Sequence, residues 1–166
     1  MWADISTYEE ARSAMNKGLV VPFINGSSAN NGRVIVPNGS SSNKGRVIVP
    51  NGSSLNKGRV NSFHSSSKWK IHFDAWKLTS NLMVIDFTAA WCGPCRFMEP
   101  AMNEFAAKYT DAEFIKIDVD ELEDVAQEFE VHVLPTFLLI KKGIEVDKLV
   151  GANKEELRKK IEKHRV

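Results

Sequence analysis

One short segment, Trp91-Cys92-Gly93-Pro94-Cys95, constrains the fold of this chain more than any other, because it holds both of the chain's cysteines. Two thiols separated by two residues close into a disulfide only where the backbone turns enough to bring their Cα atoms within about 7 Å. Gly93-Pro94 favours such a turn, and Pro94, which lacks an N–H group, suits the first position of a helix. The segment therefore predicts a turn that leads into a helix.

The residues on either side extend this prediction. Upstream, Leu82 to Phe87 is an apolar run of strand length that contains one acid, which indicates a buried strand of a parallel sheet. Downstream, apolar residues recur at helical spacing, namely Phe97, Ala101 and Phe105, beside Met98 and Met102. A strand, a turn and a helix in this order place Cys92 at the N-terminus of the helix.

This placement gives the two thiols different chemistry. Free N–H groups and the positive end of the helix dipole favour a thiolate over a thiol, so we expect Cys92 to be the nucleophile. Cys95, about one turn further in and less exposed, would be the resolving thiol that closes on Cys92 and expels a reduced partner. Asp86, the acid inside the apolar strand, is expected to be buried, with a pKa raised by desolvation. It could then exchange a proton with Cys95 near neutral pH.

Three other interpretations stay open at this point. The cysteines could be half of a zinc site, although the chain's four histidines are not at ligand spacing. They could form a permanent structural disulfide, as in secreted proteins, although the first ten residues contain three acids and no apolar stretch of signal-peptide length. Asp86 could be a strand-end acid that faces water.

Four segments of the chain match the pattern of one known family: Val84 to Cys95, Phe114 to Glu121, Pro135 to Phe137, and Val150 to Glu155. From about Asn61 to Val166 the chain thus resembles the thioredoxin family, most closely the plant cytosolic h-type thioredoxins. The resemblance implies that Cys92 attacks, that Cys95 resolves, that Asp86 is the buried acid and that Pro135 is a cis-proline facing the site. It also implies a surface on which the backbone of a target docks, lined by Trp91, Gly93, Pro94, Leu134, Pro135, Gly151 and Ala152.

The chain departs from the family pattern at two positions. Leu134 stands before the cis-proline where many relatives have Met, which keeps the site apolar. Phe114 stands where bacterial thioredoxins carry a lysine near the buried acid. This position therefore holds no basic residue, so the pKa of Asp86 need not follow that of the buried acid in bacterial thioredoxins.

The pattern over the rest of this half predicts an α/β protein with the thioredoxin fold, a central mixed sheet of about five strands flanked by about four helices. Val60 to Phe63 should be the first strand, and Ser65 to Ser67 should cap a helix that runs to about Thr79. The further elements expected are a strand over Ala112 to Asp118, a helix over Glu121 to Phe129, a hairpin of Thr136 to Lys141 with Ile144 to Val150 around Lys142-Gly143, and a last helix capped by Asn153 and Glu156.

Residues 1–59 form a low-complexity extension in this prediction, and residues 60–166 form the thioredoxin domain. Gly32, Gly45 and Gly58 each begin Gly-Arg-Val, thirteen residues apart, and a degenerate earlier copy begins at Gly18. Each copy offers a short apolar strand followed by a turn, so a small solenoid is one possibility. Against it, two perfect copies bury little surface, and Gly-, Ser- and Asn-rich sequence usually stays flexible. We expect a disordered tether that is separable from the fold and the chemistry.

These observations predict a thiol-disulfide oxidoreductase, a protein-disulfide reductase whose redox centre is the Cys92–Cys95 pair, with no bound cofactor and no metal. The family resemblance implies re-reduction by an NADPH-dependent thioredoxin reductase, or by glutathione and glutaredoxin. The formal net charge of +1 gives no reason to expect nucleic-acid binding, and no apolar run is long enough to span a membrane. A serine-rich, acid-poor stretch after Ala11 weakly resembles an organelle transit peptide, but three acids precede it. We expect a cytoplasmic monomer.

Two competing functions are weighed against this one. A redox-independent binding or holdase module would use the apolar surface around Trp91 and Pro135 and would not need the thiols. A disulfide-forming or isomerising enzyme would use the same dithiol. Gly-Pro between the cysteines, with no His to stabilise the thiolate further, favours the reductant over the latter.

Overall fold

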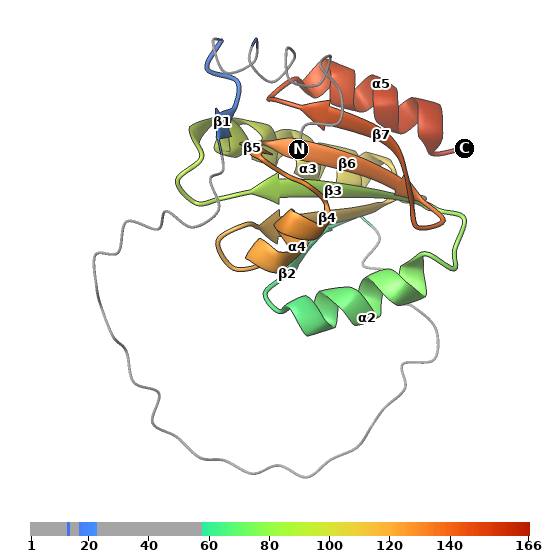
Figure 1. The fold of residues 1–166 in the computed structure, drawn as a ribbon. Coiled ribbons are helices and arrows are strands. Elements are labelled where there is room, and N and C mark those ends of the chain that lie inside the picture. Colours follow the sequence, from blue (N-terminus) through green and yellow to red (C-terminus); the bar gives the residue numbers. More distant parts are fainter. Residues whose placement is uncertain (1–12, 14–16, 23–57) are drawn as a thin grey trace, which may run out of the picture.

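The computed structural model describes residues 13, 17–22 and 58–166. The repeats that begin at Gly32 and Gly45, and the prediction that they are disordered, lie outside the described residues. The described part is built on a five-stranded mixed sheet in the order β2-β4-β3-β6-β7, with helices on both faces (Figure 1). The predicted α/β architecture of about five strands and four helices is confirmed.

The central strand carries the approach to the cysteines. The strands of the main sheet are β2 (Val60–Phe63), β3 (Leu82–Thr88), β4 (Glu113–Asp118), β6 (Thr136–Lys141) and β7 (Ile144–Val150). β3 lies parallel to β4 on one side and antiparallel to β6 on the other. Every residue of β3 is buried, which explains why its sequence is almost continuously apolar. The hairpin of β6 and β7 turns as predicted, with positive φ at both Lys142 and Gly143.

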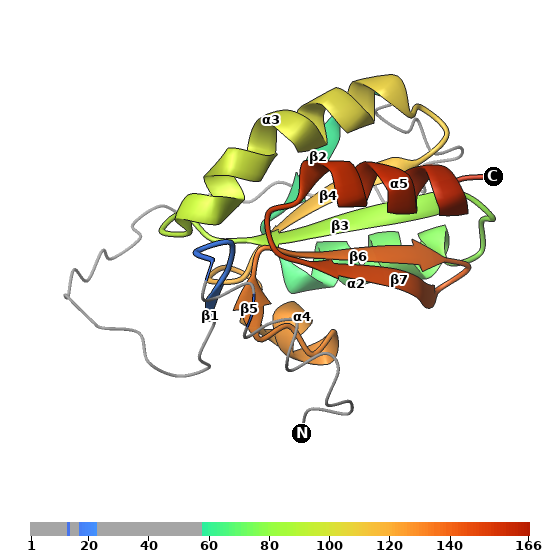
Figure 2. The same ribbon diagram turned by 90° about the horizontal axis from the view of Figure 1, so that it is seen from above.

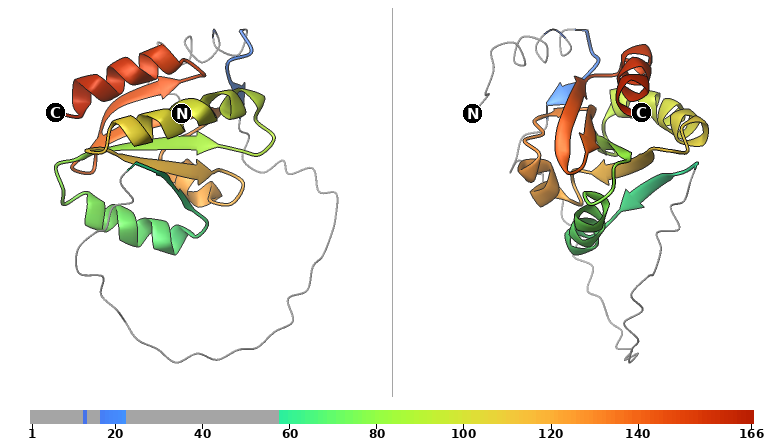
Figure 3. Two further views of the ribbon diagram at one scale, coloured as in Figure 1. Left: turned by 180° about the vertical axis from the view of Figure 1, so that it is seen from behind. Right: turned by 90° about the vertical axis from the view of Figure 1, so that its right-hand side faces the viewer.

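Among the described residues, four helices cover the two faces of this sheet. α2 (Ser66–Trp76) and α4 (Glu123–Glu128) lie on one face, and α3 (Gly93–Lys108) and α5 (Lys154–His164) lie on the other (Figures 2 and 3). Alternate residues of β3 point into two separate apolar clusters, because successive side chains of a strand face opposite sides of the sheet. The cluster beneath α2 and α4 also contains Cys92 and Cys95, so the disulfide is anchored to the core.

The apolar stripe of α3 differs from the predicted one at Phe97. This side chain is 73% exposed, although the sequence pattern grouped it with Ala101 and Phe105. The buried stripe begins one residue later, at Met98, and continues through Ala101, Met102 and Phe105. Spacings of three and four residues from Met98 keep that stripe on one face of the helix, and Phe97 lies outside it.

A second, two-stranded sheet joins part of the N-terminal extension to the domain. β1 (Val21–Pro22) pairs antiparallel with β5 (Val133–Leu134), the short strand before β6 (Figure 1). Val21–Pro22 are therefore a paired strand, and the separability of the extension from the fold and the chemistry stays a prediction. Of the helices that the structure describes, none combines the length and the apolar character needed to cross a membrane.

Candidate active site

The two cysteines lie where β3 passes into α3. Cys92 is the N-cap residue of α3 and the helix begins at Gly93, so Pro94 is its second residue and not its first. A disulfide joins Cys92 to Cys95, whose Cα atoms are 5.3 Å apart. The backbone N–H of Cys95 donates to Cys92 Sγ at 3.2 Å. After reduction, the same N–H would stabilise a thiolate on Cys92 at the positive end of the helix.

The burial of the cysteines differs from the prediction. Cys92 is 0% exposed and Cys95 is 3% exposed, so the prediction that Cys95 is the less exposed of the two is wrong for this oxidised structure. Trp91, which precedes them, is 49% exposed, and its indole N–H donates to Asp120 Oδ2 at 2.9 Å. The exposed indole therefore lies next in the chain to a sulfur that is covered. Asp120 was not singled out, although it belongs to one of the segments that carry the family resemblance.

Asp86 lies near the end of β3 and is 4% exposed, which excludes the alternative of a strand-end acid facing water. Its Oδ1 atom is buried and has no hydrogen-bond partner among the described residues. Burial raises the pKa of Asp86 to about 7, against the opposing charge of Lys116 and with a smaller contribution from Glu99 in the same direction. A carboxyl group with this pKa can both accept and release a proton near neutral pH.

Asp86 and Cys95 line one cavity of about 250 Å³, together with Lys116 and Glu99. Lys116 Nζ donates to Glu99 Oε1 at 2.6 Å. Lys116 is the register partner of Asp86 across β3 and β4, so both side chains point to the same face of the sheet. The acid therefore has a cationic neighbour, Lys116, which lies two residues beyond Phe114 in the sequence. A cavity of this size, lined by several charged side chains, has room for water that would relay a proton between the carboxyl group and the thiol.

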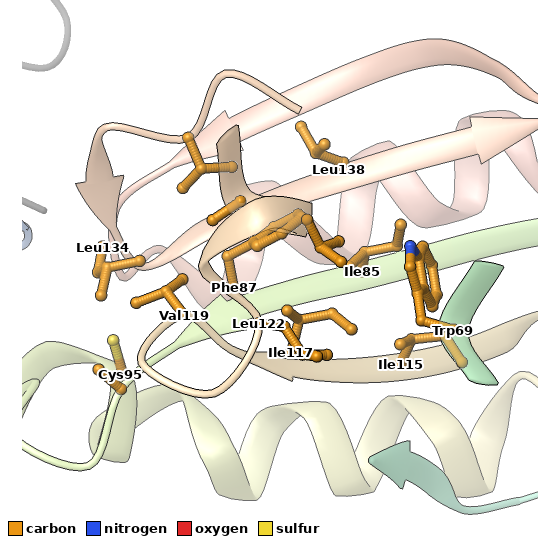
Figure 4. Close-up of a cluster of buried hydrophobic side chains, with 14 of the residues drawn as sticks. Trp69, Ile85, Phe87, Cys95, Ile115, Ile117, Val119, Leu122, Leu134 and Leu138 are labelled. Carbon is orange, nitrogen blue, oxygen red and sulfur yellow. The ribbon is translucent and has the colours of Figure 1, made fainter. Parts of the chain in front are cut away.

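The other residues named from the resemblance come from two loops that meet beside the cysteines. The Leu134–Pro135 peptide bond is cis, and the Gly151 N–H donates to the Pro135 carbonyl at 2.9 Å. This bond ties the end of β7 to the cis-proline. Figure 4 shows Leu134 at the end of the apolar cluster where Cys95 lies. The described residues hold no group of three or more His, Cys, Asp or Glu side chains that could bind a metal ion.

Comparison with known proteins identifies the family. The family model described as thioredoxin matches residues 65–163, which is more than half of the chain. The chain belongs to the thioredoxin family. Thioredoxin H2 of Arabidopsis thaliana is 52% identical over 103 residues, which are 62% of this chain and 77% of that protein. Thioredoxin H4 of the same plant is 53% identical over 102 residues, which are 61% of this chain and 86% of that protein.

Solved structures agree with this assignment. The crystal structure of thioredoxin NaTrxh from Nicotiana alata matches with a TM-score of 0.65 and 59% identity, over 69% of this chain and 100% of its own. A thioredoxin f2 in complex with ferredoxin:thioredoxin reductase matches with a TM-score of 0.61 and 30% identity, over 68% of this chain and all of its own. The predicted relation to plant h-type thioredoxins and the predicted activity are confirmed: this thioredoxin is a thiol-disulfide oxidoreductase. The family acts on disulfide-containing targets, is reduced by thioredoxin reductase, and needs no cofactor for this chemistry.

Proposed function

We propose that Cys92 attacks the disulfide of a protein target, and that Cys95 resolves the mixed disulfide with Asp86 as its proton acceptor. In the first step the Cys92 thiolate bonds to one target sulfur, the target's S–S bond breaks, and its other sulfur leaves as a thiolate. Asp86 then takes the proton of the Cys95 thiol, and the Cys95 thiolate attacks Cys92 Sγ. The bound target sulfur leaves, so two electrons have passed to the target and the Cys92–Cys95 disulfide has formed.

The observation that carries this division of roles is the cavity shared by Asp86 and Cys95. An ionised carboxyl group buried with one oxygen unpartnered is unstable, and taking up a proton relieves that cost. Cys92 does not line that cavity and instead caps the helix, where its sulfur accepts the Cys95 N–H. The proton acceptor is therefore on the side of the resolving thiol, which is the thiol that must lose a proton in the second step.

The remaining assignments follow the family. A target's backbone would dock on Trp91, Gly93, Pro94, Leu134, Pro135, Gly151 and Ala152, all within residues 60–166, with residues 1–59 as an extension. Thioredoxin reductase with NADPH would return electrons to the disulfide, and glutathione with glutaredoxin is the alternative donor. We expect a cytoplasmic monomer that holds no cofactor and binds neither nucleic acid nor membrane.

Reduction of insulin disulfides tests this mechanism, with either electron donor supplied in excess. Asp86→Asn should slow turnover at pH 7 by about tenfold or more, because general-base assistance to Cys95 is lost. Glu113→Gln is the matched control, since Glu113 is a second buried acid of the same sheet but bonds to His72 and Asn61 away from the cysteines. Equal turnover by Asp86→Asn and the wild type would remove Asp86 from the mechanism, and slow turnover by both variants would indicate a general loss of structure. The donor that supports turnover identifies the reducing system.

A further inference from the structure

Residues Leu19–Pro22 lie on the surface that the proposed function gives to the target. β1 pairs antiparallel with β5, with Val21 opposite Leu134 and Pro22 opposite Val133. Leu134 is the residue directly before the cis-proline. Figure 2 shows β1 next to β5, near the end of α3 where the cysteines lie.

Two further contacts hold the same segment. The Ala152 N–H donates to the Leu19 carbonyl at 3.2 Å, so a backbone donor of the proposed docking surface is already used by the chain itself. Val20 is 4% exposed and packs with Val133, which is 5% exposed, and with Val150. Val21, on the other side of the strand, packs against the apolar cluster that contains both cysteines and Leu134.

The attacking sulfur is not exposed to solvent in this structure. Cys92 is 0% exposed, yet a sulfur atom that exchanges disulfides must be reached by a second sulfur of the target or of the reductase. The neighbouring Trp91 is half exposed, so the loss of exposure concerns Cys92 itself and not every residue of the turn before α3.

We propose that Leu19–Pro22 is an intramolecular occupant of the target-docking surface, and that targets and the reductase reach Cys92 only when this segment leaves. This regulation rests on the proposed function, since it concerns the same site. The segment binds as an added strand, which supplies backbone hydrogen bonds together with alternating apolar side chains. The occupant of the docking surface is thus a short extended piece of this same chain, and a target competes with this piece for the edge of β5.

The contacts are also few enough to be reversible. Within the described residues β1 has two residues, and Pro22 has no N–H to donate toward β5. A strand of this length alone is marginal in water. The segment should therefore open and close, and the rate at which Cys92 reacts should be reduced by the fraction of time for which the surface is occupied.

A double substitution in the full-length chain, Val20→Asp with Val21→Asp, tests the proposal. Two carboxylates cannot be buried unpaired against Val133 and the cluster around the cysteines, so the segment should be expelled. We expect dithiothreitol to reduce the oxidised variant about tenfold faster than the wild type, because the fraction of accessible Cys92 rises. The amide hydrogen of Ala152 should exchange faster with solvent in the same variant, since its bond to Leu19 is lost. Insulin reduction should rise as well.

The control is Val34→Asp with Val36→Asp, which adds the same charge in the next copy of the repeat. It should leave all three measurements at wild-type values, and thermal unfolding should show that both variants remain folded. Unchanged dithiothreitol reduction and Ala152 exchange in the Val20, Val21 variant would overturn the proposal, and so would an equal effect of the control. If both of these rates rise while neither protein reduces insulin, the occupied surface stands and the proposed function fails.

Discussion

Replacing Asp86 with Asn should stabilise the folded protein, and the gain should depend on pH. Asp86 has a pKa of about 7 in the folded protein against an ordinary value of 3.8. Because its folded-state pKa is raised, the fold favours the protonated acid. The protonated side chain is tolerated below pH 3.8, and stability is lost progressively as the pH rises from there through 7. Asn keeps the size and neutrality of the protonated acid, so it should escape this loss.

The size of the gain follows from the two pKa values. Each difference of one in pKa corresponds to about 1.4 kcal/mol, so the ionised Asp86 costs about 4 kcal/mol at pH 8. At pH 4 most of this cost is absent, and it falls to about 0.6 kcal/mol. The cost at pH 8 is a large fraction of the total stability of a domain, which is about 5–15 kcal/mol.

Urea unfolding of the oxidised wild type and of Asp86→Asn, at about pH 4, 6 and 8, measures this difference. Comparison of the two proteins at each pH cancels the other titrating groups. The difference in free energy of unfolding should grow between about pH 4 and 7 and then level off. Glu113→Gln should destabilise the protein instead, because it disturbs a buried acid that accepts from His72 and Asn61. A difference that stays constant with pH, or an Asp86→Asn protein that is less stable at pH 8, would refute the reasoning.

Three further predictions concern the thiols, the charges around Asp86 and the hairpin. In the reduced protein, iodoacetamide should alkylate Cys92 before Cys95 at mildly acidic pH, and Cys95→Ser should accumulate mixed disulfides with targets; faster labelling of Cys95 would reverse the two roles. Lys116→Met should raise the pKa of Asp86 and Glu99→Gln should lower it, so the pH at which Asp86 destabilises the protein should move in opposite directions in the two variants. Gly143→Ala should destabilise the protein by about 1–2 kcal/mol in urea unfolding, because Gly143 has a φ of +75° and an added Cβ would lie 2.9 Å from Lys77 Cβ. Gly93→Ala, where an added Cβ meets nothing within 4 Å, should leave stability unchanged.

The sequence predicted well those features that depend on neighbours along the chain. The apolar run of β3, the Gly-Pro turn and the Lys142-Gly143 hairpin each follow from local patterns, and all three occur at the expected places. The burial of Asp86 followed in the same way, because apolar residues surround it on both sides in the sequence.

Features that depend on pairing between distant segments could not be predicted in this way. Lys116 lies beside Asp86 because of the register of β4 against β3, and one strand's sequence does not specify its register. Val21 pairs with Leu134 across a long connection, and a short strand gives little signal in the sequence. The burial of the Cys92 sulfur likewise could not be read from the residues around it in the sequence.

β2 is both the first strand of the domain and an edge strand of the main sheet. Its first residue, Val60, belongs to the Gly-Arg-Val unit that begins at Gly58, so the repeated sequence runs directly into the sheet. New copies inserted ahead of an edge strand lengthen the connection to Leu19–Pro22 and separate no two neighbouring strands of the main sheet. In general, a loop that joins two ordered ends costs about 0.6 kcal/mol more to close for each doubling of its length. Unequal recombination at the boundary between the repeats and β2 would change the number of repeats and leave the catalytic domain unchanged. Each change in repeat number would thus alter the reactivity of Cys92 by a small step, through the cost of closing the connection to Leu19–Pro22.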